Sequence, residues 1–302
     1  MSEPGSSAKA ILYAFIANLG IALAKLAAAI YTNSGSMLAE SIHSFADSGN
    51  QVLLYLGLRQ AQRPADAAHP LGYGKISYFW SFIVALMLFS VGGLFSMYEG
   101  WHKLHAPEAL NRAWVALLVL GVSIVLEAGS LAGCVREINK LRGDKPFLKW
   151  LAETRNAELV VVLGEDIAAL VGLVLAMGFV GLATITGNPV FDAVGSIVIG
   201  VVLIIVSIFI AVRIKGLIIG ASAEKDLREA ITAEVEADPA IRELLNAITL
   251  QLGPQVMVAL KIRMAPDISI AEVVDRINHL EKRIKAKFPE VKWCFVEPDI
   301  TD

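Results

Sequence analysis

Long apolar stretches constrain the fold of this chain more than any other feature of its sequence. A helix needs about 20 mostly apolar residues to cross the roughly 30 Å hydrocarbon core of a membrane. Six stretches reach or approach that length: residues 10–31, 37–58, 77–98, 114–135, 157–183 and 191–212. Only 18% of the residues are charged, against about a quarter in soluble domains. The sequence therefore predicts a six-helix transmembrane transport domain over residues 1–214.

Basic residues between the stretches indicate the orientation in the membrane. Lys and Arg follow the second, fourth and sixth stretches, whereas the opposite side offers only Lys103 and Arg112. Because Lys and Arg accumulate in cytoplasmic loops, we expect both termini in the cytoplasm. The first ten residues lack the basic region of a signal peptide. The absence of a targeting signal favours the cytoplasmic membrane of a bacterium.

The composition changes near Lys215, where charged amphipathic patterns replace the apolar stretches. A helix over 222–244 is interrupted at Asp238-Pro239, and two strand patterns flank the turn at Gly253-Pro254. A second amphipathic helix over 269–288 and a final strand over 291–300 complete the order α-β-β-α-β. The sequence predicts a small cytoplasmic α+β domain over residues 215–302, with a three-stranded sheet.

The second apolar stretch carries an unusual row of polar side chains. Glu40, His43, Asp47 and Asn50 stand at i, i+3, i+7 and i+10, which places them on one face of a helix. An ionisable group at bilayer depth costs at least ~2.5 kcal/mol and usually marks a functional pathway. His43 and Asp47, four residues apart, can reach a single ion.

Acids and amides also interrupt other apolar stretches. Glu165 and Asp166 are adjacent in the fifth, about 100° apart around a helix, so both can border one cavity. Glu127 in the fourth and Asn18 in the first are candidate pathway residues, although Glu127 could equally make a structural contact with Asn18 or Lys25.

These polar groups allow three interpretations. The chain has two cysteines, far apart, so any metal ion would be held by imidazole and carboxylates, a donor set that suits a divalent transition metal. The same groups could instead form a proton relay without metal. They could also be a hydrogen-bonded cluster that holds helices together.

Three segments then relate the chain to a known family. "SGSMLAESIHSFADSGNQ", "HPLGYGKISYF" at the third stretch and "VEPD" near the end resemble the cation diffusion facilitator family of metal–proton exchangers. The resemblance implies a transport site formed by one residue pair on the second helix and another on the fifth. His43 and Asp47 match the first pair, and Asp166 matches half of the second. Val162 stands where the family has His or Asp, so Glu165 is the expected replacement.

The order "GED" at residues 164–166 is also similar to the zinc transporter 9-like branch. By resemblance, the transported ion is zinc first, with manganese, iron or cobalt as alternatives, and the C-terminal domain forms a homodimer. Asp66 and His69 fall where some members bind a second metal, but Tyr73 replaces a histidine there, which predicts a weak or absent site. Phe295 also replaces a ligand histidine, so we expect little metal binding in the C-terminal domain.

Together these features predict a secondary transporter in contact with membrane lipids. It would export a divalent cation from the cytoplasm in exchange for protons, with no resident cofactor and no enzymatic step. The sequence contains no basic stripe with interleaved aromatics, so nucleic acid is not an expected partner. Two alternatives remain: a membrane-bound metal sensor, and a proton-coupled carrier of another cation.

Overall fold

The computed structural model describes residues 4–106, 112–266 and 268–301. The chain forms two compact units, which we call the membrane unit and the sheet unit. The membrane unit comprises Met1–Gly57, Trp80–Asp144 and Glu158–Ile214. The sheet unit comprises Leu58–Phe79, Lys145–Ala157 and Lys215–Asp302. The domain limits 1–214 and 215–302 stay a prediction.

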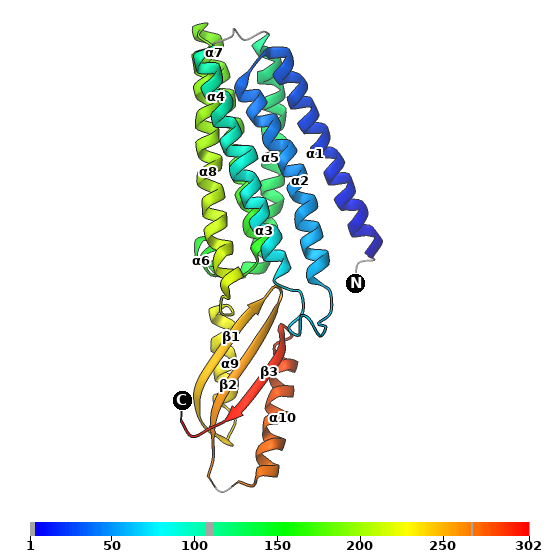
Figure 1. Ribbon diagram of the computed structural model, residues 1–302, viewed down its shortest axis with the longest axis vertical. Helices are drawn as coiled ribbons and strands as arrows, with labels where there is room; N and C mark the ends of the chain where they lie inside the picture. The colour runs from blue at the N-terminus through cyan, green and yellow to red at the C-terminus, as the bar shows by residue number, and fades with distance from the viewer. Residues whose placement is uncertain (1–3, 107–111, 267, 302) are drawn as a thin grey trace. The chain divides into compact units, whose positions relative to one another are not determined.

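Long helices that run side by side build the membrane unit (Figure 1). They are α1 (Pro4–Thr32), α2 (Gly35–Ala61), α3 (Ile76–Met87) continued by η1 (Leu88–Leu94) and α4 (Phe95–His105), α5 (Ala113–Arg142), α7 (Ala157–Thr186) and α8 (Val190–Ile219). Each of the six predicted stretches lies within these helices. In the described residues, four runs are long and apolar enough to cross a membrane: Ile76–His105, Ala113–Arg142, Ala157–Thr186 and Val190–Ile219. The predicted α-helical membrane fold is confirmed.

The start of α2 is held by an acid from α8. Ser34 Oγ donates to Asp192 Oδ1 at 2.7 Å, and the backbone nitrogens of Gly35 and Ser36 donate to the same carboxylate at 2.5 and 3.2 Å. These contacts satisfy N–H groups that a helix start leaves without partners. Asp192 lies in the first turn of α8, and its carboxylate also caps the start of α2.

The third helical run contains a π-helical segment, η1, whose Gly92 faces α2. A side chain on Gly93 would overlap Ile204 of α8, so glycine permits close contact between these helices. A Cβ at Gly92 would stand 3.9 Å from Nδ1 of His43. The π-helical segment therefore lies beside a predicted ligand, in keeping with the frequent occurrence of such segments at functional sites.

From α9 onward, the sheet unit has the predicted order of helices and strands. Its elements are α6 (Phe147–Glu153), α9 (Lys225–Glu236), β1 (Ile241–Leu252), β2 (Gln255–Met264), α10 (Ile270–Lys287) and β3 (Val291–Pro298). β2 lies between β1 and β3, antiparallel to the first and parallel to the second. The predicted small α+β domain with three strands is confirmed. The first predicted helix was too long at its end, because the break at Asp238-Pro239 is followed directly by β1.

One face of the sheet carries the core of this unit. Alternate residues of β2 are buried, from Val256 to Ile262, as expected when one side of a strand packs on a core. Ile231 of α9 and Leu280 and Ile284 of α10 belong to the same cluster, so both helices cover one face of the sheet (Figure 1). Ser269 caps α10 by accepting from the Glu272 nitrogen at 3.3 Å.

Candidate functional site

A small polar cavity of about 110 Å³ lies inside the membrane unit, among α1, α2, α5 and α7. Its lining residues are Asn18 and Ile21 of α1, Ser44, Asp47 and Gln51 of α2, Leu126, Glu127 and Ser130 of α5, and Val162, Glu165, Asp166 and Ala169 of α7. Four of them are acids, three of which were singled out in the sequence as ligands and one as a pathway residue. The cavity is the candidate site.

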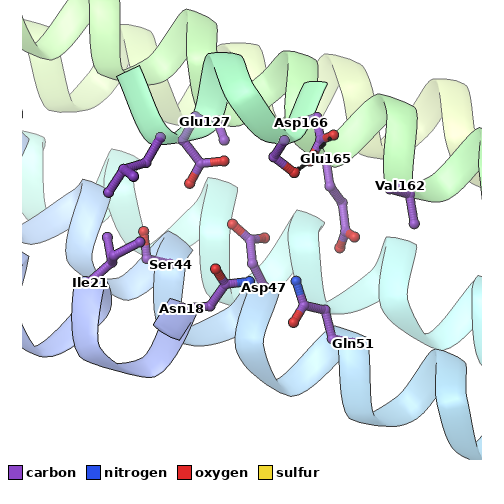
Figure 2. Close-up of a pocket in the computed structure, with 12 residues that line it drawn as sticks. Asn18, Ile21, Ser44, Asp47, Gln51, Glu127, Val162, Glu165 and Asp166 are labelled. Atoms are coloured by element: carbon purple, nitrogen blue, oxygen red, sulfur yellow. Dashed lines mark hydrogen bonds between the residues drawn. The ribbon is translucent and has the colours of Figure 1, made fainter. Parts of the chain in front are cut away.

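The acids lie on opposite walls of the cavity. Figure 2 shows Asp47 pointing from α2 across the cavity, with Glu127, Glu165 and Asp166 on the other side. Carboxylates that face each other in a membrane interior repel unless a proton or a cation lies between them. The arrangement therefore suits the binding of a positively charged species.

Hydrogen bonds hold the α7 carboxylates in place. Asn50 Nδ2 of α2 donates to Glu165 Oε1 at 2.6 Å, and Ser130 Oγ of α5 donates to Asp166 Oδ1 at 3.3 Å. Asn50 was predicted as a pathway residue; it is fully buried and links α2 to α7. Such partners orient ligands without binding the ion themselves.

His43, the fourth predicted ligand, lies behind the cavity wall. Its side chain is fully buried, and Nδ1 is 3.5 Å from Oδ1 of Asp47. It is absent from the residues that line the cavity, whereas Asp47 is among them. In this arrangement His43 can orient Asp47, and a turn of its side chain or of α2 would be needed for direct contact with an ion in the cavity.

Several buried polar atoms on α2 have no hydrogen-bond partner within the described part of the chain. They are Oε1 of Glu40, both ring nitrogens of His43, Oδ1 of Asp47 and Oδ1 of Asn50. Buried polar groups are usually paired, so a row of unpaired ones on one helix indicates a place where a ligand binds. Over the same described residues, no three His, Cys, Asp or Glu side chains are already gathered as a metal site.

Glu40 makes a contact that we did not predict. Its Oε2 is 3.5 Å from Nζ of Lys25 on α1, and Nζ also donates to Ser44 Oγ at 2.8 Å. All three side chains are buried. We considered Lys25 as a partner of Glu127; its ion pair in the structure is with Glu40.

The loop of the sheet unit places Asp66 and His69 in a turn. Asp66 accepts hydrogen bonds from the backbone of Ala68 and His69, at 2.9 and 2.7 Å, and from the Tyr73 hydroxyl at 2.7 Å. The Tyr73 hydrogen bond lowers the pKa of Asp66, and the Asp66 carboxylate raises the pKa of Tyr73. The hydrogen bonds of the turn thus occupy the carboxylate oxygens that a second metal would need. A weak or absent second metal site stays a prediction.

Ser44, Gln51 and Ser130 line the cavity but were missed in the sequence. Ser44 stands three residues before Asp47 and Gln51 four residues after it, while Ser130 follows Glu127 by three. Helical spacing from the acids would have found them. Serine and glutamine are common in any helix, so their residue types carried no signal.

The sequence matches the profile of a known protein family. The sequence profile described as "Cation efflux transmembrane domain" matches residues 11–214. The chain belongs to the cation efflux family. The predicted resemblance to cation diffusion facilitators of the zinc transporter 9-like branch is confirmed, and the chain is a multi-pass membrane protein.

Individual members of the family cover most of the chain. The mitochondrial proton-coupled zinc antiporter SLC30A9 of Xenopus laevis is 34% identical over 86% of this chain and 46% of its own length. Metal tolerance protein C4 of Arabidopsis thaliana is 30% identical over 74% of this chain and 49% of its own. The chain thus spans about half the length of these relatives.

The solved C-terminal domain of MamM in a cadmium form overlaps 26% of this chain and 98% of its own at 12% identity, with a TM-score of 0.25.

Proposed function

We propose that this protein exports a divalent transition-metal cation from the cytoplasm in exchange for protons, with zinc as the first candidate. The observation that carries the proposal is the cavity in which Asp47 of α2 faces Glu127, Glu165 and Asp166 of two other helices. Membership of the cation efflux family supports it, and the zinc antiporters among its relatives favour zinc. Manganese, iron and cobalt remain alternative substrates.

The residues supply a physical basis for exchange. Asp47, Glu165 and Asp166 would hold the ion, with His43 joining from behind Asp47 and Val162 contributing no donor. Carboxylates must lose their protons to bind a metal, so binding releases protons and a lower pH on one side displaces the ion. Opening to the two sides in turn would come from helix movement around this site. The chain needs no covalent step for this cycle.

The test is proton flux driven by a metal gradient in proteoliposomes. Wild type should release protons when zinc is added, and Asp47→Ala and Asp166→Ala should each reduce the initial rate at least about 100-fold, more than the loss of a supporting residue costs. Undiminished flux in both variants would refute the site. Zinc binding without flux would favour a membrane-bound sensor, and flux that is insensitive to chelators would favour a carrier of another cation.

Orientation and membrane are part of the proposal. The Lys and Arg pattern supports cytoplasmic termini, and a bacterial cytoplasmic membrane is the proposed location. Labelling of a single cysteine introduced at position 302 or 103 by a membrane-impermeant reagent in intact cells decides the orientation. Labelling at 302 but not at 103 would contradict it.

We also propose a homodimer through the C-terminal domain. Ile248, Ala259 and Phe295 form one row across the three strands by register, and Ile248 and Phe295 are more than half exposed. This row lies on the face opposite the core, because Val258 of the adjacent position is buried. An exposed apolar row of this kind suits a second copy. Light scattering of the purified protein should give the dimer mass, and Ile248→Asp should shift it toward the monomer.

A further inference from the structure

Lys25 is the only Lys or Arg in the six apolar stretches, which carry seven Asp and Glu residues. Its side chain is fully buried, and Nζ is 3.5 Å from Oε2 of Glu40, which is also fully buried. Removing an ion pair from water is costly and rarely improves stability over apolar packing. Such a pair next to a candidate ion site therefore calls for a functional explanation.

The Lys25–Glu40 pair is oriented with its ammonium end toward the cavity lining. Nζ of Lys25 donates to Ser44 Oγ at 2.8 Å, and Ser44 lines the cavity. Ser44 precedes Asp47 by three residues, whereas Glu40 precedes it by seven, which is one further turn of α2. The positive end of the pair is thus nearer to the site than its negative end.

Glu40 is fixed in this orientation by α7. A Cβ added to Gly172 would overlap Oε1 of Glu40, so the carboxylate lies directly against the α7 backbone. Lys25 in turn reaches Glu40 and Ser44 from α1. Three helices therefore hold the pair, and its positive end contacts Ser44 of the cavity lining.

We propose that the Lys25–Glu40 pair sets the affinity of the transport site by opposing the bound cation. The ammonium group repels a divalent ion held at Asp47 more strongly than the more distant Glu40 carboxylate attracts it. A site of several acids without this opposing charge would hold its ion too tightly for rapid release, because release rate falls as affinity rises. This inference rests on the proposed function and names the residues that tune it.

Two variants of this chain have opposite expected effects. Lys25→Met combined with Glu40→Gln removes both charges and keeps side-chain size; it should bind zinc about tenfold more tightly and transport it more slowly. Glu40→Gln alone leaves the ammonium without its counter-charge and should bind zinc about tenfold more weakly. Isothermal titration with zinc at fixed pH in detergent measures binding, and proteoliposome uptake measures transport.

A merely structural pair predicts a different pattern. Glu40→Gln alone would then be less stable because it leaves a buried charge unpaired, and neither variant would bind zinc more tightly than wild type. Equal dissociation constants in all three proteins, with zinc flux in wild type intact, would overturn this inference and leave the proposed function standing. Lack of zinc binding and flux in wild type would overturn both. If Glu40→Gln does not fold, the double variant alone decides, because only the opposing charge predicts tighter binding.

Discussion

The carboxylates of the cavity and those of the sheet unit have opposite environments. In the sheet unit, Asp226 pairs with Lys145 at 2.6 Å, Asp299 with Lys261 at 2.9 Å, and Glu234 with Arg283 at 2.6 Å. In the membrane unit, the four cavity acids have no Lys or Arg within ion-pair distance, as far as the structure describes the chain.

The sheet-unit acids support the fold as ion-pair partners, whereas the cavity acids are available to bind a cation. A paired surface acid contributes modestly to stability. A group of unpaired acids in a membrane interior is unfavourable by itself. A bound cation or proton would offset this cost, which is why we propose the transport site in the membrane unit.

The contrast between the cavity acids and the paired acids of the sheet unit is tested most strongly by one matched pair of substitutions. Glu165→Gln keeps the oxygen that accepts the Asn50 hydrogen bond but removes the charge, so it should reduce zinc flux at least about tenfold, the lower end for ligand-supporting positions. Glu234→Gln makes the same change in the sheet unit and should leave flux near wild type. Both are measured as initial rates in proteoliposomes. Equal flux in the two variants would remove the distinction between the units.

A smaller effect is expected from adding a ligand beside Glu165. Val162 lines the cavity and offers no donor, and an imidazole there would make the site softer and more favourable to zinc than to manganese. Val162→His should raise the ratio of zinc to manganese uptake by roughly threefold to tenfold, within the range in which supporting groups alter metal affinity. Val162→Leu is the control for size. An unchanged ratio would show that position 162 does not face the ion.

The smallest effect concerns the pH dependence of stability in the sheet unit. Hydrogen bonds from Lys287 and Arg283 lower the pKa of Glu234, so its folded pKa lies below its unfolded one. The resulting stability is present above the unfolded pKa and is lost as pH falls through the folded pKa. Glu234→Gln should lower the free energy of unfolding at pH 7 by less than about 1 kcal/mol, measured by denaturant unfolding. The two proteins should converge once the pH falls below the folded pKa of Glu234; a gap that persists there would point to packing rather than charge.

The sequence predicted features that depend on periodicity within one segment. Apolar length located the membrane helices, and spacing placed Asp47 and Asn50 on one face of α2. The alternation of β2 and the amphipathic pattern of α10 predicted the sheet and its covering helix. Each of these needs only local geometry.

Features that depend on the packing of different helices escaped prediction. Spacing gave His43 and Asp47 the same face, but the neighbouring helices decide that only Asp47 reaches the cavity. The pairing of Lys25 with Glu40 rather than Glu127 depends on how α1 lies against α2. The π-helical segment at Leu88–Leu94 arises within an apolar run that reads as an ordinary helix.

The Asp192 contacts at the start of α2 also bear on how the protein can move. A helix held at one end moves least at that end and most at the other. Asp47 stands 11 residues from Ser36, or about 16 Å along the helix at 1.5 Å per residue. A tilt of about 10° around the Asp192 anchor would carry Asp47 sideways by roughly 3 Å over that length. That displacement exceeds a metal–oxygen bond length, so a slight tilt of α2 is enough to make or break the site.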